Sequence, residues 1–327
     1  MKRLTVIILI SVIYVIIAIE MAMTATEVSS EKLPETQLRK SEVTGATTVA
    51  PVRSTDVPVI KLNTGYSMPI LGLGTWTLDN KTAEEAVYFA IQNGYRLIDT
   101  ARYYGNEVGV GRAVRRAIDN NVVKREALFI TSKILPTRNV KDTEAEVDAS
   151  LAALGLDYLD LMLIHQPGFN DQETYKALER RVKAGRLRSI GISNYYTPEE
   201  FERINRIAEI TPAVVQNENH IYYQNNALQD YLKQYGVVVE SWYPFGGRPN
   251  IKEVLENETI KEIADSHRKT TAQVILRWQI QAGYVVIPGS RNPEHIKENI
   301  SIFDFELTDD EMKEIGKLNQ GRRFENW

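Results

Sequence analysis

The chain contains no cysteine, so disulfide bonds, thiolate nucleophiles and cysteine-ligated zinc sites are excluded. Histidine is scarce as well: four occur, and no two of them have the i, i+4 spacing of a helical zinc site. No basic tract of the kind that binds nucleic acid is present, and the net charge of −4 arises from interspersed acidic and basic residues. The composition therefore argues against a catalytic metal and against a nucleic-acid partner.

The glycine fingerprint of a doubly wound dinucleotide-binding sheet is missing too. Its nearest match is GVGRAV at residues 109–114, which lies in a stretch of helical periodicity and not in a turn after the first strand. A barrel glycosidase would need paired acids at strand ends, and Asp99 is the only acid placed in that way. Both classes are therefore disfavoured.

The N-terminal residues have the layout of a targeting segment. Lys2 and Arg3 precede an apolar run over residues 4–19, and small residues follow, as in a secretory signal. The run is slightly shorter than the roughly 17–25 residues of a spanning helix, so an uncleaved membrane anchor is the alternative. The sequence predicts a signal peptide or anchor at residues 1–25, a flexible polar linker at 26–58 and one globular domain at 59–327.

Strand-like and helix-like stretches alternate regularly in the globular domain. Amphipathic stretches such as 81–93, 143–154 and 197–208 predict helices. Apolar runs predict strands at residues 70–74, 96–99, 128–132, 159–164, 189–192, 213–215, 237–240 and 285–288. Eight strand–helix repeats over about 250 residues predict a (β/α)8 TIM barrel, with a doubly wound sheet as the runner-up. Residues 59–66 predict a β-hairpin that closes the barrel bottom.

Polar residues stand where three of the strand-like runs end. Asp99 ends one run, with Tyr104 five residues later, while Lys133 and His165 follow the next two runs. Because the carboxyl ends of parallel barrel strands converge on one face, we expect these four side chains to meet there.

The chemistry of this set suits a carbonyl group. A tyrosine phenol has a pKa of about 10, which a nearby ammonium group lowers, and a carboxylate can hold that ammonium in place. A neutral histidine can orient a carbonyl oxygen by hydrogen bonding. Such a site polarises and protonates a carbonyl, but no side chain can supply hydride, so a nicotinamide cofactor is required.

Further motifs occur in a fixed order through residues 59–327: GLGTW at 72–76, GYRLIDTA at 94–101, YGNE at 104–107, TSK at 131–133, LIH at 163–165, GISN at 191–194, IPGS at 287–290 and EN at 298–299. In this order they resemble the aldo-keto reductase family, in its branch of prokaryotic-type aldehyde and ketone reductases. The resemblance implies NAD(P)H-dependent reduction of aldehydes or ketones to alcohols. It also implies that Tyr104 is the proton donor of a catalytic tetrad completed by Asp99, Lys133 and His165.

The resemblance assigns a cofactor site as well. It implies that three polar residues bind the nicotinamide carboxamide and that one aromatic residue stacks on the nicotinamide ring. It further implies that two residues begin a loop near the pyrophosphate and that three residues contact the adenosine end. In that order these are Ser193, Asn194, Gln216, Trp242, Phe245, Gly246, Ser290, Arg291 and Asn299, with Thr75 and Trp76 of the first motif completing the set.

Two departures from the family bear on the cofactor. Many relatives carry lysine at the position of Gly289 and arginine at that of His295, both near the ribose 2′-phosphate. Arg291 can bind that phosphate through its guanidinium group, so NADPH is expected, with NADH as the alternative. The resemblance further implies a small-molecule carbonyl substrate and a monomer.

The alternative function is a cofactor-binding regulatory module on a reductase scaffold with little turnover, which the intact tetrad disfavours. Localisation stays open between two alternatives. The charges before residues 4–19 favour an exported or membrane-anchored barrel. Reduced nicotinamide cofactor is not expected to be plentiful outside the cytoplasm, which favours a cytoplasmic barrel.

Overall fold

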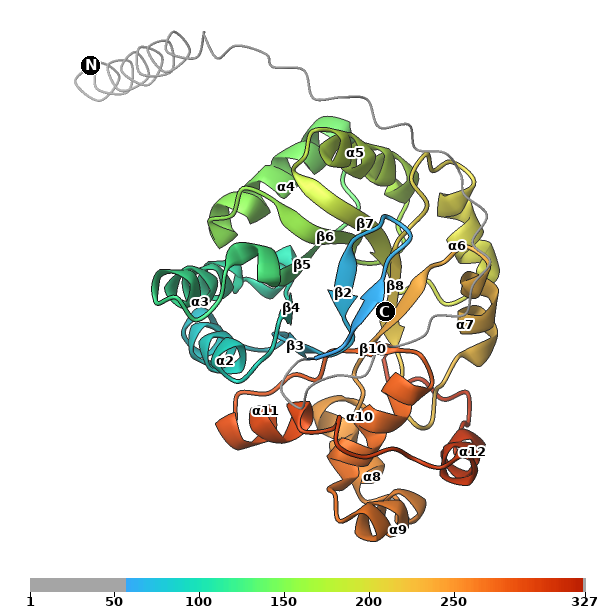
Figure 1. Ribbon diagram of the computed structural model, residues 1–327. Helices are drawn as coiled ribbons and strands as arrows, with labels where there is room; N and C mark the ends of the chain where they lie inside the picture. The colour runs from blue at the N-terminus through green and yellow to red at the C-terminus, as the bar shows by residue number, and fades with distance from the viewer. Residues whose placement is uncertain (1–56, 326–327) are drawn as a thin grey trace, which may run out of the picture. The chain divides into compact units, whose positions relative to one another are not determined.

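The computed structural model describes residues 57–325. Eight parallel strands follow one another in sequence order through a single sheet. They are β3 (Gly72–Gly74), β4 (Leu97–Asp99), β5 (Phe129–Ile134), β6 (Leu159–Ile164), β7 (Leu187–Ser193), β8 (Val214–Glu218), β9 (Val238–Trp242) and β10 (Val285–Val286). Parallel bridges from Leu71 to Val286 and from Gly74 to Gly289 join the first strand to the last. The sheet therefore closes into the predicted (β/α)8 barrel (Figure 1).

A hairpin precedes the barrel, as the sequence predicts. β1 (Val59–Lys61) pairs antiparallel with β2 (Ser67–Pro69). Asn63 in its turn donates a hydrogen bond from Nδ2 to the carbonyl oxygen of Pro212, 3.0 Å away and just before β8 begins. Met68 is fully buried in the apolar cluster at this end of the barrel. The hairpin thus closes the bottom, opposite the strand ends that carry the candidate catalytic residues.

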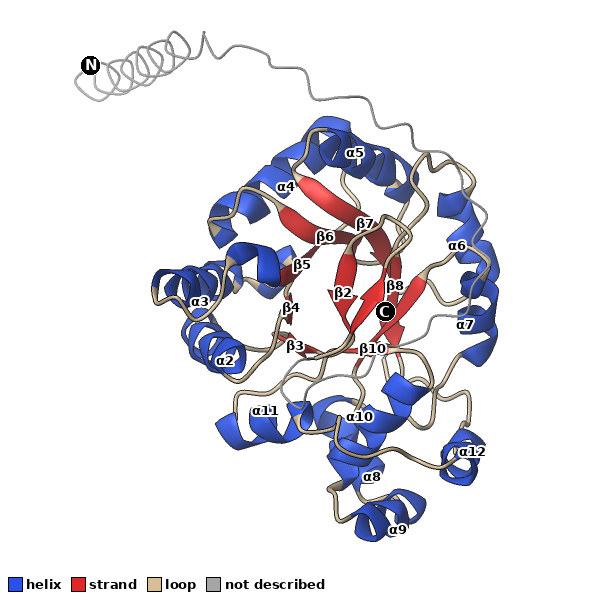
Figure 2. Ribbon diagram, viewed as in Figure 1, coloured by secondary structure: helices blue, strands red, loops and turns tan. Residues whose placement is uncertain are grey.

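Helices cover the outside of the barrel (Figure 2). They are α2 (Asn80–Gln92), α3 (Glu107–Asp119), α4 (Val140–Leu154), α5 (Asp171–Lys183), α6 (Pro198–Asn205), α7 (Asn226–Lys233), α10 (Thr271–Gln281) and α11 (Pro293–Ile300). Further helices are α8 (Gly247–Leu255), α9 (Glu258–His267) and α12 (Asp309–Lys317), and two short 3-10 turns are η1 (Arg102–Tyr104) and η2 (Arg125–Ala127). α9, α10 and α12 share an apolar cluster of their own.

Several strands run further than the apolar runs that predict them. β5 continues through Lys133, β8 through Gln216 and β9 through Trp242, all in regular parallel register. The interior of the barrel is apolar near the hairpin and polar near the carboxyl ends of the strands. The apolar pattern therefore stops while the backbone ladder continues, and sequence periodicity places the strand ends too early.

The near-match to a dinucleotide fingerprint at residues 109–114 lies inside α3, as predicted. A Cβ atom on Gly109 would lie 2.0 Å from the carbonyl oxygen of Asn80, and one on Gly111 would lie 2.2 Å from that of Leu154. These glycines let α3 pack directly against the start of α2 and the end of α4. Their role is close helix packing.

The predicted signal or anchor at residues 1–25 lies outside the described residues, as does all but the end of the linker at 26–58. Within residues 57–325, no helix combines the length and the apolar character that crossing a membrane requires.

Candidate active site

A cavity of about 510 Å³ opens at the carboxyl ends of the barrel strands. Asp99, Tyr104 and His165 line it, and Lys133 lies behind them, fully buried. The structure therefore brings the four predicted catalytic residues to one end of the barrel. The volume is within the range of about 300–1,000 Å³ that small-molecule sites occupy.

Lys133 is the centre of this group. From β5, its Nζ donates to Oδ1 of Asp99 at 2.6 Å, to the carbonyl oxygen of Thr100 at 3.0 Å and to the hydroxyl of Tyr104 at 3.1 Å. An ammonium group has three protons, so these contacts use all of them. The ammonium is thereby held between a carboxylate and a phenol.

Burial and the neighbouring charges shift the pKa of each of these groups. Burial by itself lowers the pKa of Lys133, but the Asp99 carboxylate and the Tyr104 hydroxyl outweigh it and raise that pKa. Burial raises the pKa of Asp99, and the adjacent ammonium opposes the rise. Burial and the charge of Lys133 lower the pKa of His165 to about 3, so its imidazole is neutral at neutral pH.

The pKa of Tyr104 differs from the expectation drawn from the sequence, which was a lowered value. The charge of Lys133 lowers the pKa of Tyr104, as expected, but burial of the phenol is the larger effect and the net shift is upward. Removing an ionisable group from water disfavours its charged form, and the single ammonium does not offset that cost. Tyr104 is therefore a neutral phenol with a proton to donate.

Aromatic rings surround the reacting end of the cavity. The His165 ring lies 5.6 Å from the Tyr104 ring, centroid to centroid, in an edge-on arrangement. The Trp76 ring lies 4.8 Å from that of Tyr104 and 6.0 Å from that of Tyr103, which is exposed. Trp76, predicted from the resemblance as a cofactor contact, thus lies beside the phenol, where a substrate would approach.

The four residues predicted to contact the nicotinamide all line the cavity: Ser193, Asn194, Gln216 and Trp242. The Asn194 side chain is held by hydrogen bonds to neighbouring groups, including one from its Nδ2 to the Ser193 hydroxyl at 3.3 Å. Its Nδ2 donates to the carbonyl oxygen of His165 at 2.8 Å, and its Oδ1 accepts from the hydroxyl of Tyr196 at 3.0 Å.

The remaining predicted contacts divide into two groups. Phe245, Ser290 and Arg291 line the cavity, whereas Thr75, Gly246 and Asn299 do not. Thr75 donates from its hydroxyl and from its backbone N–H to the carbonyl oxygen of Asp99, at 2.9 Å and 3.0 Å. It therefore fastens the end of β4.

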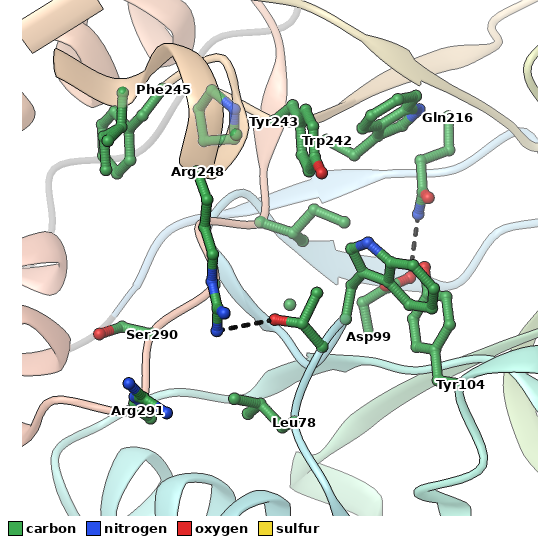
Figure 3. A pocket seen from close by; sticks show the side chains of 18 of the residues that line it. Leu78, Asp99, Tyr104, Gln216, Trp242, Tyr243, Phe245, Arg248, Ser290 and Arg291 are labelled. Atoms are coloured by element: carbon green, nitrogen blue, oxygen red, sulfur yellow. Dashed lines mark hydrogen bonds between the residues drawn. The ribbon is translucent and has the colours of Figure 1, made fainter. Parts of the chain in front are cut away.

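One charged residue that lines the cavity, Arg248, was not identified from the sequence. The guanidinium of Arg248, at the start of α8, donates to the Thr77 hydroxyl at 3.2 Å across the cavity (Figure 3). The sequence did contain a signal for it: Arg248 is a cation that directly follows Gly246 and Gly247, at the start of the loop predicted to lie near the pyrophosphate.

Glu240 was missed as well. It is fully buried on β9, two residues before Trp242. Strand alternation would have placed it on the same face of β9 as Trp242.

The cavity suits a nicotinamide dinucleotide. One end carries amide groups and the Trp242 ring, and Figure 3 shows Arg248, Ser290 and Arg291 away from Asp99 and Tyr104. Amides match a carboxamide, the indole offers a stacking face, and guanidinium groups bind phosphates. A tyrosine that can donate a proton, next to a cavity that can hold a nicotinamide cofactor, is the arrangement expected in an active site of an oxidoreductase.

Comparison with known proteins agrees with this class. Residues 70–320 match the model of the aldo/keto reductase family. The chain is 42% identical to the NAD(P)H-dependent D-xylose reductase I,II of Candida tropicalis, over 82% of this chain and 94% of that protein. It is 43% identical to the glyoxal reductase of Bacillus subtilis, over 81% of this chain and 94% of that protein.

A solved structure with the same fold holds a cofactor. The aldo-keto reductase of Bombyx mori in complex with NADP has a TM-score of 0.78 and is 32% identical, over 83% of this chain and 95% of that one. The chain belongs to the aldo/keto reductase family. It is an NAD(P)H-dependent oxidoreductase that reduces carbonyl groups.

Proposed function

We propose that this enzyme reduces small aldehydes with NADPH, and that Tyr104 donates the proton to the carbonyl oxygen. The observation that carries the proposal is the Lys133 ammonium, which lies 2.6 Å from the Asp99 carboxylate and 3.1 Å from the Tyr104 hydroxyl. As Tyr104 gives up its proton, negative charge develops on its oxygen. The ammonium already lies in place to stabilise that charge, and no solvent has to reorganise.

The other residues position the reactants. The neutral His165 imidazole can hydrogen-bond the carbonyl oxygen without competing for the proton. Ser193, Asn194 and Gln216 would bind the carboxamide, and Trp242 would cover one face of the ring. When bound, the reduced nicotinamide supplies the hydride that no side chain can provide.

The preference for NADPH rests on the arginines. Gly289 and His295 line the cavity where many relatives carry cations, and Arg291 lines it beside them. Arg248 is a second guanidinium on the same cavity. A guanidinium forms charge-assisted hydrogen bonds to phosphate, so this end favours the additional phosphate of NADPH.

Small polar aldehydes fit the reacting end best. The exposed rings of Trp76 and Tyr103 form an apolar wall beside the phenol, and His165 offers a polar group. The similar proteins named above are reductases of D-xylose and of glyoxal. We therefore place sugar aldehydes and 1,2-dicarbonyls first among the substrates.

The deciding experiment is a titration of the purified protein with NADPH and with NADH, followed by quenching of tryptophan fluorescence. Turnover is then measured with glyoxal and D-xylose. We expect tighter binding of NADPH and oxidation of NADPH with both substrates. Binding of neither cofactor would contradict the proposal.

For the N-terminal segment we propose export or membrane attachment through residues 4–19, with residues 26–58 as a tether to a monomeric barrel over residues 59–327. The apolar run and the polar composition after it support this organisation. Fractionation of cells that express the full chain, compared with a chain that starts at Val59, tests it. Recovery of both in the soluble fraction, with an uncleaved N-terminus, would contradict it.

A further inference from the structure

Glu240 is a buried acid that has no part in the catalytic and cofactor-binding roles proposed above. It lies level with Gln216 of β8 in the parallel register, and its side chain is fully shielded from solvent. It is not among the residues that line the cavity. Glu240 therefore acts on the site through a neighbour and not through contact with substrate or cofactor.

That neighbour is Gln216. Its Nε2 donates to Oδ2 of Asp99 at 2.9 Å and to Oε2 of Glu240 at 2.7 Å, and Figure 3 shows the first of these bonds. A primary amide has two N–H protons, so the two carboxyl groups use both. The opposite amide orientation would turn the carbonyl oxygen toward the Asp99 carboxylate, which repels it. The two acids thus fix the orientation of the Gln216 amide, whose carbonyl oxygen is left to accept a bond from a ligand.

In the described part of the chain, no cation forms an ion pair with Glu240, and the charge of nearby Lys133 lowers its pKa less than burial raises it. The three protons of Lys133 are used by Asp99, Thr100 and Tyr104. Among the residues that the structure describes, Oε1 of Glu240 is buried without a hydrogen-bond partner. A buried carboxylate with a single amide donor is strongly disfavoured as an ion. Burial, with the nearby charge of Asp99, accordingly raises the pKa of Glu240 to about 8.

Ionisation of Glu240 would change the charge of the site. With Glu240 neutral, the charges of Asp99 and Lys133 cancel. An ionised Glu240 leaves a net negative charge beside Tyr104, which raises the pKa of the phenol and repels the phenolate that forms during proton donation. The charged and titratable groups that face Glu240 are Asp99 of β4, Lys133 of β5 and Tyr104 of η1. Its register partners on the two adjoining strands, Gln216 and Val285, do not titrate.

We propose that Glu240 is a positioning residue that holds the Gln216 amide as a neutral acid and, once ionised, slows proton donation by Tyr104. This inference rests on the proposed function, since it assumes that Tyr104 is the donor. It predicts an alkaline loss of activity that belongs to a residue outside the tetrad.

The test compares the wild type with Glu240→Gln, whose amide oxygen can still accept from Gln216 but which cannot ionise. We measure kcat/KM for glyoxal at saturating NADPH from pH 6 to pH 10. Between pH 7 and pH 9 the wild type should lose about tenfold, as one ionisation near pH 8 requires, and Glu240→Gln should lose less than about twofold. Each variant is compared with its own value at pH 7.

Glu179→Gln is the matched control. Glu179 is also a buried acid, but it accepts from the backbone N–H groups of Glu209 and Ile210, away from the cavity. This control should keep the wild-type activity and the wild-type alkaline loss. A merely structural role for Glu240 would lower stability without removing the loss.

A second readout needs no turnover. The infrared C=O band of a protonated carboxylic acid should disappear with a midpoint near pH 8 in the cofactor-free wild type, and Glu240→Gln should lack that band. An equal alkaline loss in Glu240→Gln and the wild type, or a wild type without the band, would overturn the role of Glu240. A wild type that binds cofactor and shows the band but reduces no carbonyl would instead overturn the proposed function.

Discussion

The Lys133 ammonium and the Asp99 carboxylate form an ion pair of 2.6 Å inside the barrel, with both side chains almost wholly shielded from solvent. Removing two charges from water is costly, and a buried ion pair commonly contributes little net stability. This pair is therefore best understood by what else the ammonium contacts. Its bond to the Tyr104 hydroxyl links the pair to the proposed reaction.

Replacing Tyr104 with Phe should abolish most turnover while leaving the fold intact. Phenylalanine keeps the ring that packs against Trp76 and His165 but removes the proton. We expect kcat for carbonyl reduction to fall by about 10²–10⁴-fold, the usual contribution of a general acid. The cofactor Kd, measured by fluorescence quenching, should change less than about twofold. Unchanged turnover would contradict Tyr104 as the donor.

Lys133→Met should destabilise the protein because it leaves the Asp99 carboxylate buried without its counter-ion. We expect a loss of about 3–5 kcal/mol in the free energy of unfolding, measured by urea denaturation. The double variant Lys133→Met with Asp99→Asn removes both charges and should recover much of that loss while staying inactive. A single variant as stable as the wild type would show that Asp99 does not need the ammonium.

Arg291→Ala should weaken binding of NADPH and spare that of NADH. Hydrogen bonds to charged groups contribute about 1.5–3 kcal/mol, which corresponds to a rise of roughly 10- to 100-fold in the Kd of NADPH. Arg206→Ala is the control, since Arg206 is an exposed arginine just after α6 that is not among the residues lining the cavity, and its ion pair is with Glu202 of that helix. Equal weakening of both cofactors by Arg291→Ala would assign Arg291 to the pyrophosphate instead.

His165 should make the protein less stable in acid. Its pKa is lowered to about 3 in the folded state, whereas an unperturbed histidine has a pKa of about 6.5. Between these values the unfolded chain binds the extra proton, so stability is full above about pH 6.5 and falls as the pH drops toward 3. From pH 6 to pH 5 this group should cost about 1 kcal/mol, a loss that His165→Gln lacks. Parallel pH–stability curves for the two proteins would exclude this contribution.

Two glycine-to-alanine changes in helices should have opposite effects. Gly111→Ala places a Cβ atom 2.2 Å from the carbonyl oxygen of Leu154, so α3 must move away from α4. We expect a loss of about 1–3 kcal/mol in the free energy of unfolding. Gly316→Ala in α12 meets nothing within 4 Å and should stabilise the protein by about 0.5–1 kcal/mol. The midpoints of thermal unfolding should separate the two variants in these directions.

The sequence was sufficient to predict the barrel and the meeting of four polar side chains at its mouth, because both depend on local order along the chain. In a (β/α)8 barrel each strand lies next to the strands that precede and follow it in the sequence. Once hydrophobic periodicity locates the strands along the chain, their order in the sheet is therefore known. A polar residue at the end of each run then lies at the same mouth of the barrel. Asp99, Tyr104, Lys133 and His165 were found in this way.

The tertiary structure decided what depends on distant residues and on desolvation. Gln216 reaches Asp99 across 117 positions of sequence, and Arg248 reaches Thr77 across 171, because the barrel closes and not because of any local pattern. The raised pKa values of Glu240 and Tyr104 follow from how completely the fold removes these groups from water. Residue type and spacing along the chain place an acid or a phenol at the site, but only its three-dimensional surroundings determine its charge.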